Sequence, residues 1–332
     1  MTFHHPVVIG SGSWGTALAV FLAQKCPQVH LVGRNQELAD AINWKHCNPR
    51  YLPKVTLPQN LLATTDASLV SQADLVLFVV PTSATRETAE KLATLHLPSD
   101  AVLVSCAKGI ELTTGKRMSQ VIADSFPDNP IAVFSGPNHA EEIAAGLPAA
   151  ATIGCANEAT GTALQHLFAN DRFRSYTNPD LAGIELGGAI KNVFAIAAGV
   201  TMGLKLGDNA ISALVTRALA EMTRLGTALG GQPETFAGLS GLGDLIATCF
   251  SVHSRNHKVG LALGQGKTLA EAVGELGMVA EGVPNTRSIY QAARRAEVRT
   301  PILDAVHAVL YENVPADGAL DRLFRQPPRQ EV

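Results

Sequence analysis

A glycine-rich turn near the N-terminus constrains the fold of this chain more than any other feature. A short apolar run at residues 7–9 leads into Gly10-Ser11-Gly12-Ser13-Trp14-Gly15, and an apolar helical stretch follows. In such a turn Gly10 permits the tight bend, Gly12 lets a pyrophosphate approach the backbone, and Gly15 lets the helix pack on the strand. The helix N-terminus offers free N–H groups to the phosphates. The sequence therefore predicts a dinucleotide site here, and the alternative is a tight turn without a ligand.

Short apolar runs alternate with helical segments from residue 7 to about residue 177. The runs show little polar alternation, which is typical of strands buried on both faces of a parallel sheet. This rhythm predicts an α/β fold with an open, doubly wound sheet of the Rossmann type. The predicted strands are Pro6–Ile9, Val29–Val32, Asp74–Val80, Ala101–Cys106, Ile131–Phe134, Ala150–Ile153 and Phe173–Tyr176, and the predicted helices are Trp14–Gln24, Gln36–Lys45, Ser83–Leu95, Asn138–Ala145 and Glu158–Ala169.

The pattern changes at Asn178-Pro179. Beyond this point no strong strand signal appears, and alanine-rich helical stretches are separated by glycine clusters. Pro179 suits the first turn of a long helix that runs to about Met202. We expect a dinucleotide-binding domain over residues 1–178 and an all-helical substrate-binding and catalytic domain over residues 179–332.

Charge and apolar content restrict the class of protein. The 332 residues carry 26 Lys+Arg against 29 Asp+Glu, a formal net charge of −3. Nucleic acid is not expected as the main partner, because neutralising phosphates needs an excess of basic residues. The best candidate for a membrane span, Val193–Leu204, is shorter than the about 18 apolar residues that a span needs, and it lies between Lys191 and Lys205. We expect no membrane span.

Cysteine and histidine usage points to the cytoplasm and away from metal chemistry. The five cysteines are scattered without a CxxC motif, which is typical of reduced thiols in a cytosolic protein. The ten histidines show no HxH or HExxH spacing, so no metal site is expected. The first residues lead into a strand and do not form a signal peptide. The prediction is a soluble, cytoplasmic protein.

An arginine stands where the second predicted strand ends, in Leu31-Val32-Gly33-Arg34-Asn35. A strict NAD binder carries Asp or Glu at this place to accept a hydrogen bond from the ribose 2′-hydroxyl, whereas Arg fits a 2′-phosphate. Arg34 therefore favours NADPH, or the use of both coenzymes. The alternative is an exposed arginine without a ligand.

Two lysines lie in apolar surroundings. Lys108 follows a predicted strand, at the end where open α/β sheets bind ligands, although a solvated loop lysine is equally consistent. Lys191 lies midway along the long predicted helix, and its neighbours three and four residues away include no carboxylate. It either extends along an apolar surface or faces a cleft floored by glycine, where partial desolvation would lower its pKa toward the range useful for proton transfer.

A glycine-dense loop, residues 238–243, ends in the carboxylate Asp244, which is the expected partner of Lys191. Further on, Ser254-Arg255-Asn256 combines a hydroxyl, a guanidinium and an amide at the start of another predicted helix. That set suits a small phosphate monoester. The alternative for Ser254 is an ordinary N-cap.

Taken together, these residues resemble those of bacterial NAD(P)-dependent glycerol-3-phosphate dehydrogenases over nearly the whole chain. Several motifs occur in one order and spacing, which makes the signal far more specific than any of them alone. They are Gly10-Ser11-Gly12-Ser13-Trp14-Gly15-Thr16-Ala17, Asn48-Pro49-Arg50-Tyr51-Leu52-Pro53, Ser105-Cys106-Ala107-Lys108-Gly109-Ile110-Glu111, Ser135-Gly136-Pro137-Asn138-His139-Ala140, Gly188-Ala189-Ile190-Lys191-Asn192, Gly241-Leu242-Gly243-Asp244, Ser254-Arg255-Asn256 and Val279-Ala280-Glu281-Gly282.

The resemblance implies reduction of dihydroxyacetone phosphate to sn-glycerol 3-phosphate, the precursor of glycerophospholipids, with NADPH or NADH. Arg34 makes NADPH the favoured coenzyme. The resemblance further implies that Lys191 donates the proton to the developing C2 alkoxide, and it also implies a possible homodimer. The substrate residues would be Lys108, Gly136, Asn138, Lys191, Asp244, Ser254, Arg255 and Asn256. To Gly10, Gly12 and Gly15 of the glycine turn the resemblance adds the coenzyme residues Ser13, Trp14, Arg34, Lys108, Ala140, Arg255, Val279 and Glu281.

Two other functions remain open from the residues alone. A β-hydroxyacid dehydrogenase shares the dinucleotide domain and a lysine on a helix, but it explains Ser254-Arg255-Asn256 less well. A non-catalytic NADP(H) sensor would bind the coenzyme without turnover and would leave Lys191 and Asp244 without a role. Oxidation of NADPH with dihydroxyacetone phosphate, compared with unphosphorylated hydroxyacids, separates the three.

Overall fold

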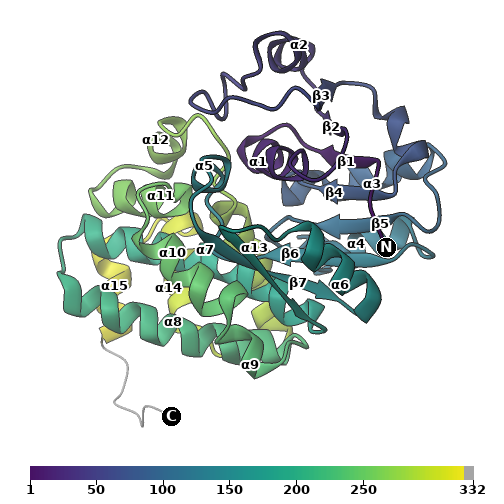
Figure 1. The fold of residues 1–332 in the computed structure, drawn as a ribbon. Helices are drawn as coiled ribbons and strands as arrows, with labels where there is room; N and C mark the ends of the chain where they lie inside the picture. Colours follow the sequence, from purple (N-terminus) through teal and green to yellow (C-terminus); the bar gives the residue numbers. More distant parts are fainter. Residues whose placement is uncertain (325–332) are drawn as a thin grey trace. The chain divides into compact units, whose positions relative to one another are not determined.

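The computed structural model of the protein describes residues 1–324, which fall into two compact units. The sheet unit contains Met1–Glu111 and Lys116–Glu185. The helical unit contains Leu112–Gly115 and the chain from Leu186 onward. In Figure 1 the sheet unit is coloured purple to teal, and most of the helical unit is green to yellow.

The sheet unit is built on eight strands in the order β3-β2-β1-β4-β5-β6-β7-β8. The order reverses beside β1, because β2 lies on one side of it and β4 on the other. Ligands of open α/β sheets bind at such a reversal, outside the carboxyl ends of the strands. The strands are β1 (Pro6–Ile9), β2 (Val29–Val32), β3 (Leu61–Thr64), β4 (Leu75–Phe78), β5 (Val102–Ser105), β6 (Ile131–Ser135), β7 (Ala149–Cys155) and β8 (Phe173–Asn178).

Helices cover both faces of this sheet, as a doubly wound fold requires. One face packs under α1 (Ser13–Leu22), α2 (Gln36–Lys45), α5 (Ala140–Ala144) and α6 (Glu158–Leu167). The opposite face packs under α3 (Thr85–Ala93), α4 (Met118–Ser125) and the 3-10 turn η1 (Ala67–Gln72). Alternate strand residues supply the two cores: Val8 belongs to the first, whereas Val7 and Ile9 belong to the second. The predicted α/β fold class is confirmed.

Three features of the sheet unit were not predicted. The edge strand β3 and the helix α4 are short segments with weak patterns, and no element was expected at either place. Strand β7 runs antiparallel to β6, with Phe134 opposite Ile153. Its apolar, non-alternating sequence indicated burial on both faces correctly, but burial does not determine strand direction.

The helical unit contains the second half of the chain, and the predicted all-helical character is confirmed. Its first helix, α7 (Leu181–Gly203), begins in the sheet unit. Within residues 1–324, α7 is the only unbroken helix that is long and apolar enough to cross a membrane. Of its most apolar 18-residue window, 83% is buried inside the protein, as in the core helices of soluble proteins. The other helices are α8 (Asp208–Ala228), α9 (Pro233–Phe236), α10 (Asp244–Phe250), α11 (Arg255–Gly264), α12 (Leu269–Gly274), α13 (Gly282–Arg295), α14 (Pro301–Tyr311) and α15 (Ala316–Phe324), and a π turn, η3 (Leu239–Gly243), precedes α10.

Candidate active site

The glycine turn after β1 has the geometry that its sequence predicts. Gly10 has φ of +118°. If this residue carried a side chain, its Cβ would lie 2.4 Å from the carbonyl oxygen of Val79, which is too close. A Cβ on Gly15 would lie 1.8 Å from the carbonyl oxygen of Gly10, so α1 packs directly on the turn. At Gly12, by contrast, a Cβ would meet no atom within 4 Å. The backbone is therefore accessible at the place where a pyrophosphate is expected.

A buried amide that the sequence interpretation left without a role holds this turn. The side-chain nitrogen of Asn48 donates to the carbonyl oxygen of Ser11 at 3.1 Å and to the hydroxyl of Thr16 at 2.8 Å. Its side-chain oxygen accepts from the backbone N–H of Tyr51 at 3.1 Å. Asn48 has no exposed surface. The only sequence signal was an Asn-Pro pair in a loop, and its distant partners could not be inferred from it.

The expected cation for a 2′-phosphate, Arg34, lies just beyond β2 and is exposed. The next residue, Asn35, caps α2 by accepting the N–H of Leu38 at 2.7 Å. The position of Arg34 at the carboxyl end of β2 agrees with the sequence interpretation, and its side chain is accessible to an anionic ligand.

A polar corner forms where β5 and β6 end. The Lys108 ammonium donates to the carbonyl oxygen of Gly136 at 2.9 Å. The side-chain nitrogen of Asn138 donates to the carbonyl oxygen of Ala150 at 3.0 Å. The side-chain oxygen of Asn138 is buried and has no hydrogen-bond partner among residues 1–324. The structure thus brings together three predicted substrate residues of the sheet unit and leaves one acceptor unsatisfied beside them.

Two predicted coenzyme residues lie in the same unit and contribute apolar surface. Trp14, in the first turn of α1, packs against Phe134 with ring centroids 5.9 Å apart. Ala140 begins α5 and is buried against Ala17 and Leu52. Ser13 is the first residue of α1, and no described side chain caps that helix end.

The helical unit buries the predicted pair of Lys191 and Asp244. The Lys191 ammonium donates to Asp244 Oδ1 at 2.9 Å, and the two residues are 6% and 2% exposed. The same ammonium donates to the Thr248 hydroxyl at 2.5 Å. That hydroxyl is also 2.6 Å from the carbonyl oxygen of Asp244, one helical turn earlier. The expected pairing is confirmed, and Thr248 is a third member that sequence reasoning missed.

The glycines before Asp244 explain how the carboxylate reaches Lys191. A Cβ on Gly187, four residues before Lys191 on α7, would lie 2.7 Å from the carbonyl oxygen of Ser240. A Cβ on Gly241 would lie 2.1 Å from the carbonyl oxygen of Phe236. The loop backbone therefore packs against the α7 backbone, and Asp244 starts α10 beside the lysine.

Burial keeps the thiol next to this pair in its protonated form. Burial raises the pKa of Cys249 to about 12, although the Lys191 ammonium acts in the opposite direction. Burial also raises the pKa of Cys106, two residues before Lys108. Because the thiolate is the nucleophilic form, neither cysteine suits covalent catalysis. Within residues 1–324, no group of three or more His, Cys, Asp or Glu residues could hold a metal ion.

The predicted phosphate anchor lies at the start of α11. Ser254 caps this helix by accepting the N–H of His257 at 3.2 Å, so the ordinary capping role is present. The amide nitrogen of Asn256 donates to Asn192 Oδ1 at 2.8 Å, and its oxygen accepts from the N–H of Gly282 at 2.8 Å. Asn192 follows Lys191 in the chain, so the start of α11 lies beside the lysine.

Arg255 differs from its two neighbours because it is exposed. One of its guanidinium nitrogens donates to the carbonyl oxygen of Val279 at 2.7 Å. Val279 and Glu281 directly precede α13. The structure therefore brings three of the predicted coenzyme residues, Arg255, Val279 and Glu281, into one region of the helical unit.

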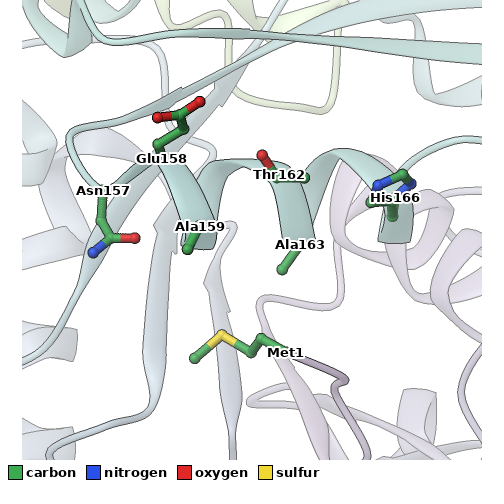
Figure 2. A pocket seen from close by; sticks show the side chains of 7 residues that line it. All are labelled: Met1, Asn157, Glu158, Ala159, Thr162, Ala163 and His166. Atoms are coloured by element: carbon green, nitrogen blue, oxygen red, sulfur yellow. The ribbon is translucent and has the colours of Figure 1, made fainter.

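A separate hollow of about 690 Å³ lies on the sheet unit, between the N-terminus and α6. Figure 2 shows Ala159 and Ala163 pointing from α6 toward Met1. The other lining residues are Asn157, Glu158, Thr162 and His166. None of the predicted site residues lines it.

Comparisons with known proteins match both halves of the chain to one family. Residues 7–161 match the model of the NAD-dependent glycerol-3-phosphate dehydrogenase N-terminus, and residues 180–321 match that of its C-terminus. The glycerol-3-phosphate dehydrogenase (NAD(P)+) of Desulfitobacterium hafniense is 44% identical over 325 residues, with 98% of this chain and 92% of the relative covered. The enzyme of that name from Corynebacterium aurimucosum is 48% identical over 328 residues, with 98% of each chain covered.

A solved structure gives the same result. The crystal structure of glycerol-3-phosphate dehydrogenase from Coxiella burnetii superimposes with a TM-score of 0.94 at 37% sequence identity. The similarity covers 97% of this chain and 99% of that one.

Proposed function

Because the chain belongs to the NAD-dependent glycerol-3-phosphate dehydrogenase family, it is an oxidoreductase that interconverts dihydroxyacetone phosphate and glycerol 3-phosphate, and we propose that NADPH is its favoured coenzyme and Lys191 its proton donor. The product is sn-glycerol 3-phosphate for glycerophospholipid synthesis, and the enzyme acts in the cytoplasm as a homodimer. Residues 1–178 form the dinucleotide-binding domain, and residues 179–332 form the substrate-binding domain that carries the catalytic lysine.

The glycine turn fits the coenzyme, because the open space at Gly12 leaves the backbone accessible to a pyrophosphate. When bound, the coenzyme supplies the hydride, which protein side chains cannot supply. The residues that would hold it are Gly10, Gly12, Ser13, Trp14, Gly15, Arg34, Lys108, Ala140, Arg255, Val279 and Glu281.

The chain's own residues orient the ketone and manage the proton. As negative charge develops on the carbonyl oxygen bonded to C2 of the substrate, the Lys191 ammonium stabilises that charge and donates a proton to the oxygen. Asp244 and Thr248 hold the ammonium by hydrogen bonds, so the donor is positioned before the substrate arrives. Further contacts with the substrate come from Lys108, Gly136 and Asn138. Ser254, Arg255 and Asn256 anchor its phosphate, and this remote binding energy positions the reacting carbon.

The observation that carries this proposal is the buried contact between Lys191 and Asp244. An ammonium that is removed from water is costly to maintain even beside a carboxylate, and a lysine that merely extends along an apolar surface would keep its charge in solvent. Ionisable pairs that are buried in this way concentrate at functional sites.

The test is Lys191→Ala, assayed by NADPH oxidation with dihydroxyacetone phosphate. Turnover should fall by at least ~100-fold, the low end for a lost acid–base group, while NADPH binding stays intact. Near-normal turnover would assign Lys191 a packing role. Wild-type activity on unphosphorylated hydroxyacids would support a β-hydroxyacid dehydrogenase, and coenzyme binding without any turnover would support a sensor.

A further inference from the structure

Four glycines bring α7 and α11 into backbone contact. A Cβ on Gly199 of α7 would lie 2.1 Å from the carbonyl oxygen of His257, and one on Gly260 of α11 would lie 2.0 Å from that of Ile196. Real Cβ atoms do not approach other atoms this closely. Gly203 and Gly264 repeat the arrangement one turn later. A Cβ on either of them would lie 2.5 Å from a carbonyl oxygen of the other helix. We call these four residues the glycine crossing.

The two helices run parallel in a constant register. Asn192 of α7 contacts Asn256 of α11, and four residues later the carbonyl oxygen of Ile196 lies against Gly260. Four residues further on, that of Val200 lies against Gly264. Each step of four residues advances both helices by about 6 Å. The α11 N-terminus therefore meets α7 at Asn192, the residue after Lys191.

The close approach leaves little freedom for adjustment. Helix axes are usually about 8–10 Å apart, at a distance set by the side chains between them. At the glycine crossing the facing atoms are mainly backbone atoms, which cannot rotate away as a side chain can. A methyl group added there is accommodated only if α11 moves relative to α7. Such a shift changes the distance from the Lys191 ammonium to residues 254–256.

We propose that the glycine crossing is a positioning device that sets the distance between the proton donor and the phosphate anchor, and so the length of phosphorylated substrate that the enzyme accepts. The inference rests on the proposed roles of Lys191 and Arg255. Gly199 and Gly260, which lie nearest the site, are positioning residues that act through α11. A correctly placed phosphate holds C2 at the ammonium, and a misplaced one holds it elsewhere.

The main test is Gly260→Ala, with kcat and KM measured for dihydroxyacetone phosphate and for unphosphorylated dihydroxyacetone. A misplacement of about 1 Å costs up to about 100-fold in rate, so the efficiency on the phosphorylated substrate should fall by ~10- to 100-fold. The efficiency on dihydroxyacetone should stay within ~3-fold, because that substrate does not use the anchor. Gly274→Ala is the matched control, since Gly274 also lies in a helix but its Cβ would meet no atom within 4 Å.

The ratio of the two efficiencies separates positioning from folding. A purely structural role would lower the amount of active enzyme and reduce both efficiencies equally, and that result, or an unchanged ratio in a folded variant, overturns the inference. If Gly260→Ala does not fold, as judged by circular dichroism, Gly264→Ala at the last residue of α11 is measured in the same way and decides the question.

Arg255→Ala, measured alongside, distinguishes failure of the inference from failure of the proposed function. Loss of a charge-assisted contact to the phosphate should lower the ratio by ~10- to 100-fold. If Arg255→Ala leaves the ratio unchanged, Arg255 does not bind the phosphate and the proposed anchor is wrong. If Arg255→Ala lowers the ratio and the glycine variants do not, only the positioning role is wrong. The affinity for NADPH is measured in each variant, because Arg255 is also a proposed coenzyme contact.

Discussion

At the scale of single residues, the sequence contained the Lys191 site in a readable form because its signal was local. A lysine in an apolar helix without a nearby carboxylate requires a partner from another segment, and Asp244 was the one carboxylate at the end of the glycine-dense loop. The partner was therefore predictable, and the 2.9 Å contact confirms it. Thr248 was not predictable, because a threonine one turn into a helix has many ordinary roles.

Arg34 gives the first residue-scale prediction. Its exposed side chain at the end of β2 should attract the adenosine 2′-phosphate, so NADPH should be used at least as well as NADH. Arg34→Asp should reverse this preference, because a carboxylate repels the 2′-phosphate and accepts a hydrogen bond from a free 2′-hydroxyl. The change corresponds to roughly 1–3 kcal/mol, or about 5- to 150-fold in relative affinity. Titration of both coenzymes decides it.

The salt dependence of that preference provides a control. Exposed charge pairs are screened, so the wild-type preference for NADPH should shrink as ionic strength rises. A wild type that strongly prefers NADH, together with a mutant that behaves identically, would make Arg34 a surface residue without a role in coenzyme choice.

At the scale of elements, the sequence predicted those with strong periodic signals and missed those whose identity depends on distant contacts. Strand β3 has four residues, Leu61–Thr64, and only half of them are buried. The antiparallel direction of β7 depends on its pairing with β6, which no local pattern encodes. The glycine clusters that begin at Gly203 and Gly264 were predicted to separate helices, and each of these glycines is the last residue of a helix. That each also packs against the other helix depends on distant contacts and was not predictable.

The amide that supports the glycine turn gives an element-scale prediction. Asn48→Ala removes the hydrogen bonds to Ser11 and Thr16 and should lower the free energy of unfolding by about 1–3 kcal/mol, the cost of leaving buried polar groups unsatisfied. Because the released atoms belong to the turn, the Kd for NADPH should also rise. The measurements are chemical denaturation and coenzyme titration.

A second asparagine offers the matched control for Asn48. Asn43 exchanges two hydrogen bonds of 2.8 Å with the backbone of Ala63 and so ties α2 to β3, but neither bond involves the glycine turn. Asn43→Ala should lose stability without losing affinity for NADPH. An equal loss of affinity in both variants would show that general destabilisation, and not the support of the turn, controls coenzyme binding.

The buried carboxylate that caps α14 gives a prediction about pH. Glu221 of α8 is 2% exposed and accepts the N–H groups of Ile302 and Leu303 at 3.1 and 2.9 Å. Burial raises its pKa to about 7, and nearby Asp304 adds to this, while the two N–H groups and Arg224 oppose it. The folded state therefore binds a proton more tightly than the unfolded state does. Its stabilising contribution is fully present below about pH 4.5 and is lost as pH rises through about 7.

Glu221→Gln removes this titration and keeps an oxygen acceptor for the helix N-terminus. Relative to this variant, the wild type should lose roughly 3 kcal/mol of unfolding free energy between pH 4.5 and 7.5, the equivalent of the rise in pKa from 4.5 to about 7. Denaturation curves at several pH values measure the difference. A difference between the two proteins that stays constant from pH 5 to pH 8 would contradict the raised pKa.

At the scale of the whole molecule, the proposed coenzyme residues are divided between the two units. The glycine turn and Arg34 belong to the sheet unit, and Arg255, Val279 and Glu281 belong to the helical unit. A local sequence motif predicted the first group, whereas the second group was expected only from the family resemblance. An experiment that reports on both units in one measurement is therefore the sharpest test of the complete set.

Amide hydrogen exchange with and without NADPH provides that test. At a coenzyme concentration of about 100 times the Kd, binding adds about 2.7 kcal/mol to the free energy of any opening that releases the ligand. Amide exchange through such openings is then slowed by about 100-fold. We expect this protection in the first turn of α1 and also in residues 279–282. The middle of α8, which contains no proposed coenzyme residue, is the internal control. Protection confined to the sheet unit would remove Arg255, Val279 and Glu281 from the coenzyme site and leave the glycine turn and Arg34 as its determinants.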